Sequence, residues 1–298
     1  MTQLPLIIDI KRYSFEDGPG IRSVVFFKGC PMRCVFCHNP ESQQLGPEIA
    51  FSSNLCIKCG ACVDVCPQGA LDELLSGRIL RDKCNYCGKC ADVCPTDGLR
   101  LIGKYYSVEA LTEVLLRDFE YYRHSNGGVT LSGGESTLFP SYLELLLKGL
   151  KAKGIHIVLE TSGYFNYGAF RRKIYPYLDL IYYDIKFVDN ATHLKYCGRP
   201  NGIILRNFRE LMTEGKVDIL PRIPLAPGVT LTETNLGGVV DFLRSSGAKT
   251  VAPISYNPMG LSKFETLGRP KPNLPERFMT PEETSQAYEI LKRSSLFR

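Results

Sequence analysis

Short apolar runs rich in β-branched and aromatic residues recur along the chain. Each run is bounded by glycine or polar residues, as buried strands are. The runs occupy residues 22–29, 127–134, 155–161, 180–186, 217–224 and 249–257. They are almost continuously apolar, which is typical of strands in a parallel sheet whose faces are covered by helices.

Amphipathic segments lie between most of these runs and predict helices. Ser107 is the expected N-cap of one segment, and Gly154 is the expected stop of another. The predicted helical segments are residues 108–125, 140–154, 232–247 and 280–294. Strand–helix alternation indicates a parallel sheet. We therefore predict an α/β fold, a partial (β/α)6 barrel of TIM type.

Length and charge narrow the class of protein. The chain has 298 residues, enough for one large α/β domain and a small additional module. Its net charge is +5 without a basic run or an acidic tail, so no nucleic-acid partner is expected. The sequence has no apolar run of membrane-spanning length, and we expect no signal peptide. We expect a cytoplasmic protein with no membrane contact.

Eleven of the twelve cysteines lie between positions 30 and 94. Two groups form a repeat with an offset of 28 residues, CIKCGACVDVCP from Cys56 and CNYCGKCADVCP from Cys84. Each has the spacing C-x2-C-x2-C-x3-C-P of bacterial ferredoxins, in which the fourth cysteine ligates the other cluster. The spacing predicts two [4Fe–4S] clusters. A pair of zinc sites is the alternative, but zinc favours two separated C-x2-C pairs.

The predicted ligand sets therefore cross between the two runs. One set is Cys56, Cys59, Cys62 and Cys94. The other set is Cys84, Cys87, Cys90 and Cys66. We expect a ferredoxin-like insert at residues 49–102, which divides the barrel into residues 1–48 and 103–298.

Polar residues and a third cysteine group follow the predicted strands. Active sites of parallel α/β folds form at the carboxyl ends of the strands, so we expect one functional rim. The residues expected there are Cys30, Cys34 and Cys37 after the first strand, Gly133, Gly134 and Glu135 after the second, Glu160 and Thr161 after the third, Asp184 and Lys186 after the fourth, Arg222 near the fifth and Asn257 near the sixth.

The C-x3-C-x2-C motif, with Phe36 before its last cysteine, and the Gly-Gly-Glu at residues 133–135 resemble those of radical S-adenosylmethionine enzymes. The segment SFEDGPGIRSVVFFKGCPMRCVFCHNPES and the later DIK resemble the activating enzymes of glycyl radical enzymes. The two ferredoxin runs are similar to those of the longer subgroup of that family. The resemblance spans essentially the whole chain.

The resemblance implies a chemistry. Three cysteines would hold a third [4Fe–4S] cluster with one open iron, which S-adenosylmethionine chelates through its amino and carboxylate groups. Reductive cleavage would give a 5′-deoxyadenosyl radical, which abstracts hydrogen from a backbone glycine of a partner glycyl radical enzyme. The implied protein is an oxygen-sensitive monomer of an anaerobic cytoplasm that meets its partner transiently.

The resemblance also implies roles for single residues. The residues implied at the catalytic cluster and S-adenosylmethionine are Cys30, Cys34 and Cys37 as ligands, Phe36 beside the adenine, Gly133, Gly134 and Glu135 at the amino group, and Lys186 at the carboxylate. The residues implied at a monovalent cation are Glu160, Thr161 and Asp184, with Glu160 where relatives usually have aspartate.

Four further positions complete the implied site. Asn257 stands where many relatives have a cofactor-holding histidine, and Ser136 replaces a frequent proline. Asp17 and Arg222 would contact the glycyl loop of the partner. Cys197, which is unpaired in the sequence, is expected to be a structural thiol.

Two questions stay open from the sequence. The insert clusters either relay electrons from a flavodoxin or ferredoxin donor or only staple the fold of the insert. The alternative functions are a radical S-adenosylmethionine enzyme acting on another peptide or a small molecule, and a non-catalytic ferredoxin-type electron carrier.

Overall fold

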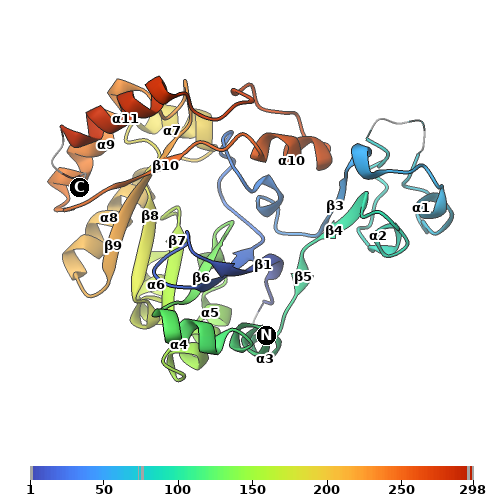
Figure 1. Cartoon of the computed structure of the whole chain (residues 1–298), viewed down its shortest axis with the longest axis horizontal. Helices are drawn as coiled ribbons and strands as arrows, with labels where there is room; N and C mark the ends of the chain where they lie inside the picture. The colour runs from blue at the N-terminus through green and yellow to red at the C-terminus, as the bar shows by residue number, and fades with distance from the viewer. Residues whose placement is uncertain (1–2, 73, 75–76, 294–295, 297–298) are drawn as a thin grey trace.

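The computed structural model describes residues 3–72, 74, 77–293 and 296. Within this part of the chain the main sheet has eight strands in the order β10-β9-β8-β7-β6-β2-β1-β5 (Figure 1). The six parallel strands are β2 (Arg22–Phe27), β6 (Gly128–Gly133), β7 (His156–Thr161), β8 (Leu180–Asp184), β9 (Asp218–Leu225) and β10 (Ala252–Ser255). The predicted α/β fold, a partial TIM-type barrel, is confirmed at this level.

Two strands of the main sheet were not predicted. β1 (Leu6–Ser14) runs antiparallel to β2, and β5 (Lys104–Tyr105) pairs antiparallel with β1. β1 lies outside the parallel strands, so several of its side chains face solvent, including the charged Lys11 and Arg12. A half-exposed strand of this kind lacks the continuous apolar run by which the other strands were recognised.

The helices lie between the strands and after them. They are α3 (Val108–Leu116), α4 (Phe119–Ser125), α5 (Pro140–Lys151), α6 (Tyr167–Lys173), α7 (Asn190–Cys197), α8 (Gly202–Glu214), α9 (Glu233–Ser245), α10 (Gly260–Thr266) and α11 (Pro281–Lys292). Short 3-10 helices are η1 (Pro40–Ser42), η2 (Ser53–Leu55), η3 (Ser136–Leu138) and η4 (Tyr175–Tyr177). Among the described helices, none has the length and apolar composition needed to cross a membrane.

The predicted helix at residues 108–125 is wrong in one respect, because it is two helices, α3 and α4. Asp118 lies at the break, where its carboxylate accepts hydrogen bonds from Ser23 at 2.6 Å and from Arg12. The backbone of Asp118, with φ −101° and ψ 9°, lies outside the helical conformation. Ser107 is the N-cap of α3 and accepts a hydrogen bond from the Ala110 amide at 3.1 Å, as predicted.

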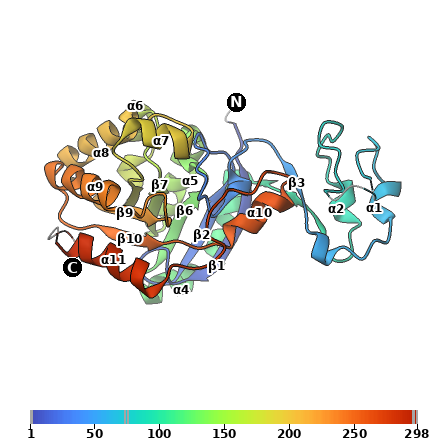
Figure 2. The ribbon, with the colours of Figure 1, turned by 90° about the horizontal axis from the view of Figure 1, so that it is seen from above.

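The segment predicted as an insert projects to one side of the barrel in both views (Figures 1 and 2). Its base is the antiparallel pair β3 (Glu48–Phe51) and β4 (Leu99–Ile102). Between them lie α1 (Ala61–Asp64) and α2 (Lys89–Asp92), with α1 farther from the barrel. The segment has a small core of its own, whose apolar members include Ile49, Leu71, Ile79 and Leu99.

The two faces of helix α5 differ in their burial. Leu147 on α5 is fully buried, whereas Leu145 on the same helix is 54% exposed. We expect Leu147→Ala to lower the free energy of unfolding by about 2–5 kcal/mol, because it leaves a cavity. The control Leu145→Ala should change it by less than about 0.5 kcal/mol. Anaerobic chemical denaturation measures both, and equal effects would contradict the burial of this face.

Candidate functional site

The loop that follows β2 carries three cysteines, and we call residues 30–37 the cysteine loop. Its backbone is fastened to the end of α7, where Cys197 accepts a hydrogen bond from the Arg33 amide at 2.8 Å. The Val35 amide donates to the Tyr196 carbonyl at 3.0 Å. Cys197 is itself fully buried. It is therefore a neighbour of the cysteine loop, which its position in the sequence does not indicate.

The thiols of this loop lie in a buried environment. Burial raises the pKa of Cys37 to about 12 and also raises the pKa of Cys30. The neighbouring Cys197, together with burial, raises the pKa of Cys34. Thiolates are therefore disfavoured here unless a strong positive charge is present. Bound iron supplies such a charge and deprotonates its thiol ligands, so the donor set fits an iron–sulfur cluster.

Gly133 and Gly134 at the end of β6 lie against the backbone of Phe27 and Gly29, which lead into the cysteine loop. Gly133 has φ +98°, and a Cβ there would lie 2.4 Å from the Phe27 nitrogen. A Cβ on Gly134 would lie 2.1 Å from the Gly29 carbonyl oxygen. The Gly134 and Glu135 amides donate to the carbonyls of Phe27 and Gly29, both at 2.8 Å. Only glycine permits this approach.

The Glu135 carboxylate is directed toward the end of β7 and is fully buried. It accepts hydrogen bonds from the hydroxyls of Thr137 at 2.7 Å and Thr161 at 2.9 Å. Ser162 donates to it through its amide at 2.9 Å and its hydroxyl at 2.6 Å. Burial raises the pKa of Glu135, and these hydrogen bonds oppose that rise. The side chain therefore ties the end of β6 to the end of β7.

A row of charged side chains crosses the ends of β7, β8 and β9. Arg222 Nη1 lies 2.6 Å from Glu160 Oε1, and Arg222 Nε lies 2.9 Å from Asp184 Oδ1. Lys186 Nζ lies 3.3 Å from the other Asp184 oxygen, and Arg222 stacks over the ring of Tyr182. Register explains the contact, because Asp184 pairs directly with Arg222.

The charges in this row stabilise one another. Burial disfavours the charged forms, but Asp184 and Glu160 outweigh it and raise the pKa of Arg222. Asp184 likewise raises the pKa of Lys186, and the two cations hold the pKa of Asp184 below its usual value. Both carboxylates expected at a monovalent cation are thus already bound by basic side chains. The cation remains a prediction.

The remaining expected residues are Asp17, Asn257 and Phe36. Asp17 lies at the amino-terminal ends of the strands, where its carbonyl accepts a hydrogen bond from Thr130 on β6 at 2.7 Å. Asn257 is exposed, and its side chain accepts from the Met259 amide at 3.0 Å. The ring of Phe36 packs 6.4 Å from that of Phe187. The structure thus separates Asp17 from the cysteine loop.

Helix α10 is a neighbour of the cysteine loop that the sequence did not reveal. A Cβ on Gly260 would lie 2.7 Å from the Cys37 carbonyl oxygen, so the helix begins in close contact with the loop. Lys263 on the same helix lies 2.7 Å from Glu41. Arg81 of the insert donates to the carbonyl of Thr266 at 3.3 Å. Helix α10 therefore contacts both the cysteine loop and the insert.

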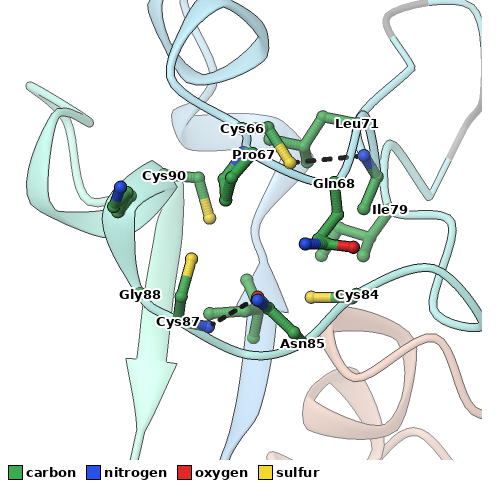
Figure 3. A pocket seen from close by; sticks show the side chains of 13 residues that line it. Cys66, Pro67, Gln68, Leu71, Ile79, Cys84, Asn85, Cys87, Gly88 and Cys90 are labelled. Atoms are coloured by element: carbon green, nitrogen blue, oxygen red, sulfur yellow. Dashed lines mark hydrogen bonds between the residues drawn. The ribbon is translucent and has the colours of Figure 1, made fainter.

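The eight remaining cysteines gather around two cavities in the insert. The proximal site is a cavity of about 360 Å3 lined by Cys66, Cys84, Cys87 and Cys90, whose sulfurs point inward (Figure 3). The distal site is a cavity of about 330 Å3 lined by Cys56, Cys59, Cys62 and Cys94. These are the two crossed sets that the sequence predicts. Among the described residues, no three His, Cys, Asp or Glu side chains lie close enough together to bind a single metal ion. The eight thiols surround the two cavities instead.

The backbone repeats around the two sites. Gly60 and Gly88 have φ of +79° and +83° and precede α1 and α2, respectively. Lys58 and Tyr86 also match, with φ of +58° and +56°. The same local conformation therefore presents the cysteines of both runs to their cavities.

Known proteins share these features. Residues 55–98 match the family described as a 4Fe-4S dicluster domain, and residues 16–69 match a 4Fe-4S single cluster domain. The choline trimethylamine-lyase activating enzyme of Oleidesulfovibrio alaskensis is 40% identical over 273 residues, covering 88% of this chain and 87% of that protein. The trans-4-hydroxy-L-proline dehydratase activating enzyme of Clostridioides difficile is 39% identical over 267 residues, covering 88% of each.

A solved structure shares the fold. The radical SAM methyltransferase from Sphaerobacter thermophilus has a TM-score of 0.51 and 14% sequence identity, covering 66% of this chain and 59% of that one. At this identity the likeness shows a common fold.

The glycine contact predicts a sharp effect of one methyl group. We expect Gly134→Ala to displace the cysteine loop, because its Cβ meets the Gly29 carbonyl oxygen. Bound iron should fall by the share of one cluster, about a third if three are present. The control Gly149→Ala lies on α5 with open space around it and should keep full iron. Iron and sulfide analysis after anaerobic reconstitution measures both, and full loading of Gly134→Ala would contradict the contact.

Proposed function

Because this chain belongs to the activating enzymes of glycyl radical enzymes, we propose that its cysteine loop holds the catalytic [4Fe–4S] cluster and its insert holds two more. The protein is an oxidoreductase-type enzyme that cleaves S-adenosylmethionine to a radical, and the radical activates a glycyl radical enzyme. The observation that carries the proposed site is the set of three thiols, one buried and two partly buried, at the carboxyl edge of a parallel sheet.

The donor set suits a cluster with one open iron. Cys30, Cys34 and Cys37 offer three ligands, and a catalytic metal site keeps a position free for its substrate. The bound cluster and S-adenosylmethionine together supply the electron transfer and the radical. The protein itself holds the cysteine loop in place through contacts of Gly134 and Cys197. It also provides positive charge near the loop for the cofactor carboxylate.

Lys186 is the proposed partner of the cofactor carboxylate. Its ammonium is mostly buried, with 10% of the side chain exposed, and its charge is held by Asp184 at 3.3 Å. Cys34 and Cys197 also act on the pKa of Lys186 electrostatically, which indicates that it lies near the cysteine loop. We propose that Gly133 and Gly134 offer backbone to the amino group, since the Glu135 carboxylate already has its hydrogen-bond donors.

Asp17 and Arg222 remain the proposed contacts of the partner's glycyl loop. They lie toward opposite ends of the strands. Tyr182 lies near both, since Arg222 lowers and Asp17 raises the pKa of its phenol. Burial is the main cause that raises the pKa of Tyr182. A glycyl loop that meets both residues would therefore extend along the strands past Tyr182.

The proposed role of the insert is electron delivery. The distal site lies toward the end of the insert that is farther from the barrel, since α1 carries Cys62 (Figures 1 and 2). Cys59 there is exposed, and Leu55 and Ile57 beside it are 44% and 62% exposed. This apolar patch next to a cluster ligand suits a small redox protein such as a flavodoxin or ferredoxin. Electrons would pass from the distal to the proximal cluster and then to the cysteine loop.

Folding of the insert is a second role for the same clusters. Its core contains few apolar side chains besides cysteines, so metal binding would contribute folding free energy. Stapling and relay are compatible, and only relay predicts a dependence of electron delivery on the insert.

Relay can be tested by removing ligands of the insert clusters. We expect Cys59→Ala with Cys87→Ala to slow flavodoxin-driven reduction of the catalytic cluster at least tenfold, because both steps of the path are altered. Dithionite-driven cleavage of S-adenosylmethionine should continue. A second variant, Ile57→Glu, keeps all ligands and should raise the apparent KM for flavodoxin. Unchanged flavodoxin-driven rates in both variants would refute relay.

The activity itself requires the open cluster. We expect the reconstituted protein to form 5′-deoxyadenosine from S-adenosylmethionine with dithionite, and Cys37→Ala to reduce this to background. Incubation with its glycyl radical enzyme partner should give a glycyl radical signal in electron paramagnetic resonance. A fully loaded protein that forms no 5′-deoxyadenosine would contradict the assignment of the cysteine loop.

A further inference from the structure

The internal repeat allows the two insert sites to be compared atom by atom. Cys56 and Cys84 open the two runs and occupy equivalent positions. In the proximal site, Cys84 Sγ accepts a hydrogen bond from the amide of Tyr86, at 3.4 Å. In the distal site, Cys56 Sγ instead accepts one from Arg78 Nη1, at 3.7 Å. Equivalent sulfurs thus meet a neutral amide in one site and a guanidinium in the other.

Arg78 is an unusual residue in its surroundings. It is 4% exposed and lines the distal cavity. Its backbone φ is +53°, in the left-handed region that residues other than glycine and asparagine seldom adopt. A guanidinium is among the costliest groups to bury, and such groups are found paired with anionic partners. A thiolate-ligated cluster would place negative charge within hydrogen-bond distance of Arg78 Nη1.

The proximal site has no matching guanidinium on its sulfurs among the residues described. Its other lining residues include the apolar Ala70, Leu71 and Ile79 and one cationic residue, Lys89, for which no hydrogen bond to a sulfur is found in the described part of the chain. Arg81 lies near Cys84, but it donates to the carbonyls of Ile49 at 3.0 Å and Thr266 at 3.3 Å. The asymmetry has a simple origin, because Arg78 belongs to the segment between the two runs, which occurs once in the chain.

We propose that Arg78 raises the reduction potential of the distal cluster, so that this cluster is reduced before the proximal one. The step is the gain of one electron from an external one-electron donor, which is thereby oxidised. The added negative charge on the cluster strengthens both the hydrogen bond to Cys56 and the attraction to the guanidinium. The distal cluster is then the site where the incoming electron first resides. The inference rests on the proposed presence of two clusters in the insert.

Three variants separate charge from hydrogen bonding. Arg78→Met removes both, Arg78→Gln keeps a donor without the charge, and Arg78→Lys keeps the charge. Arg100→Met is the control, because Arg100 is an exposed residue of β4 that does not line the distal cavity. Redox titration of the fully loaded protein, followed by electron paramagnetic resonance, measures the potential of each cluster. Cys56→Ser and Cys84→Ser identify which signal belongs to which site.

We expect Arg78→Met to shift the reduction equilibrium of the distal cluster about tenfold toward the oxidised form, or about 59 mV for one electron. Arg78→Gln should shift it in the same direction, Arg78→Lys least, and Arg100→Met not at all. The other clusters should keep their potentials.

Failure can be traced to its cause. A wild-type protein that binds about four irons instead of about twelve would refute the insert clusters and this inference with them. Full iron with an unshifted distal potential in Arg78→Met would overturn the role of Arg78 alone. If Arg78→Met does not load, an unshifted potential in loaded Arg78→Gln would have the same consequence.

Discussion

The contact between the backbones of β2 and β6 at their carboxyl ends determines where the cysteine loop lies. Gly133 and Gly134 allow the strand ends to approach within hydrogen-bond distance, and the amides of Gly134 and Glu135 then fix Phe27 and Gly29. Two further contacts hold the loop, from Cys197 at the end of α7 and from Gly260 at the start of α10. These contacts fix the backbone of the loop and of the residues that lead into it from three directions.

Charged side chains at the ends of the barrel strands hold one another in place. Arg222 forms ion pairs with Glu160 and Asp184, and Asp184 forms a further ion pair with Lys186. These ion pairs link β7, β8 and β9. Partly buried ions of this kind are tolerated because each has a partner of opposite sign. Any anion that enters here meets basic groups whose orientation is already set. The same row limits the space for an additional cation, because both carboxylates are engaged.

Much of this architecture follows from local sequence, and some of it does not. The parallel strands were predictable because each is a continuous apolar run. The crossed cysteine sets were predictable because the repeat fixes which sulfurs converge. β1 was missed because it is half exposed, and the Gly-Gly-Glu motif does not show that hydroxyl groups, including that of Thr161, surround the Glu135 carboxylate. Contacts between distant segments, such as Cys197 with the cysteine loop and Arg78 with Cys56, have no local pattern that would reveal them.

The central claim is that three cysteines leave one iron open for S-adenosylmethionine. The most direct test is electron–nuclear double resonance of the reduced protein with S-adenosylmethionine that carries 15N at its amino group. The account predicts a 15N coupling to the cluster held by Cys30, Cys34 and Cys37, and its loss in Cys34→Ala. A reduced, fully loaded protein that binds S-adenosylmethionine without such a coupling would contradict it.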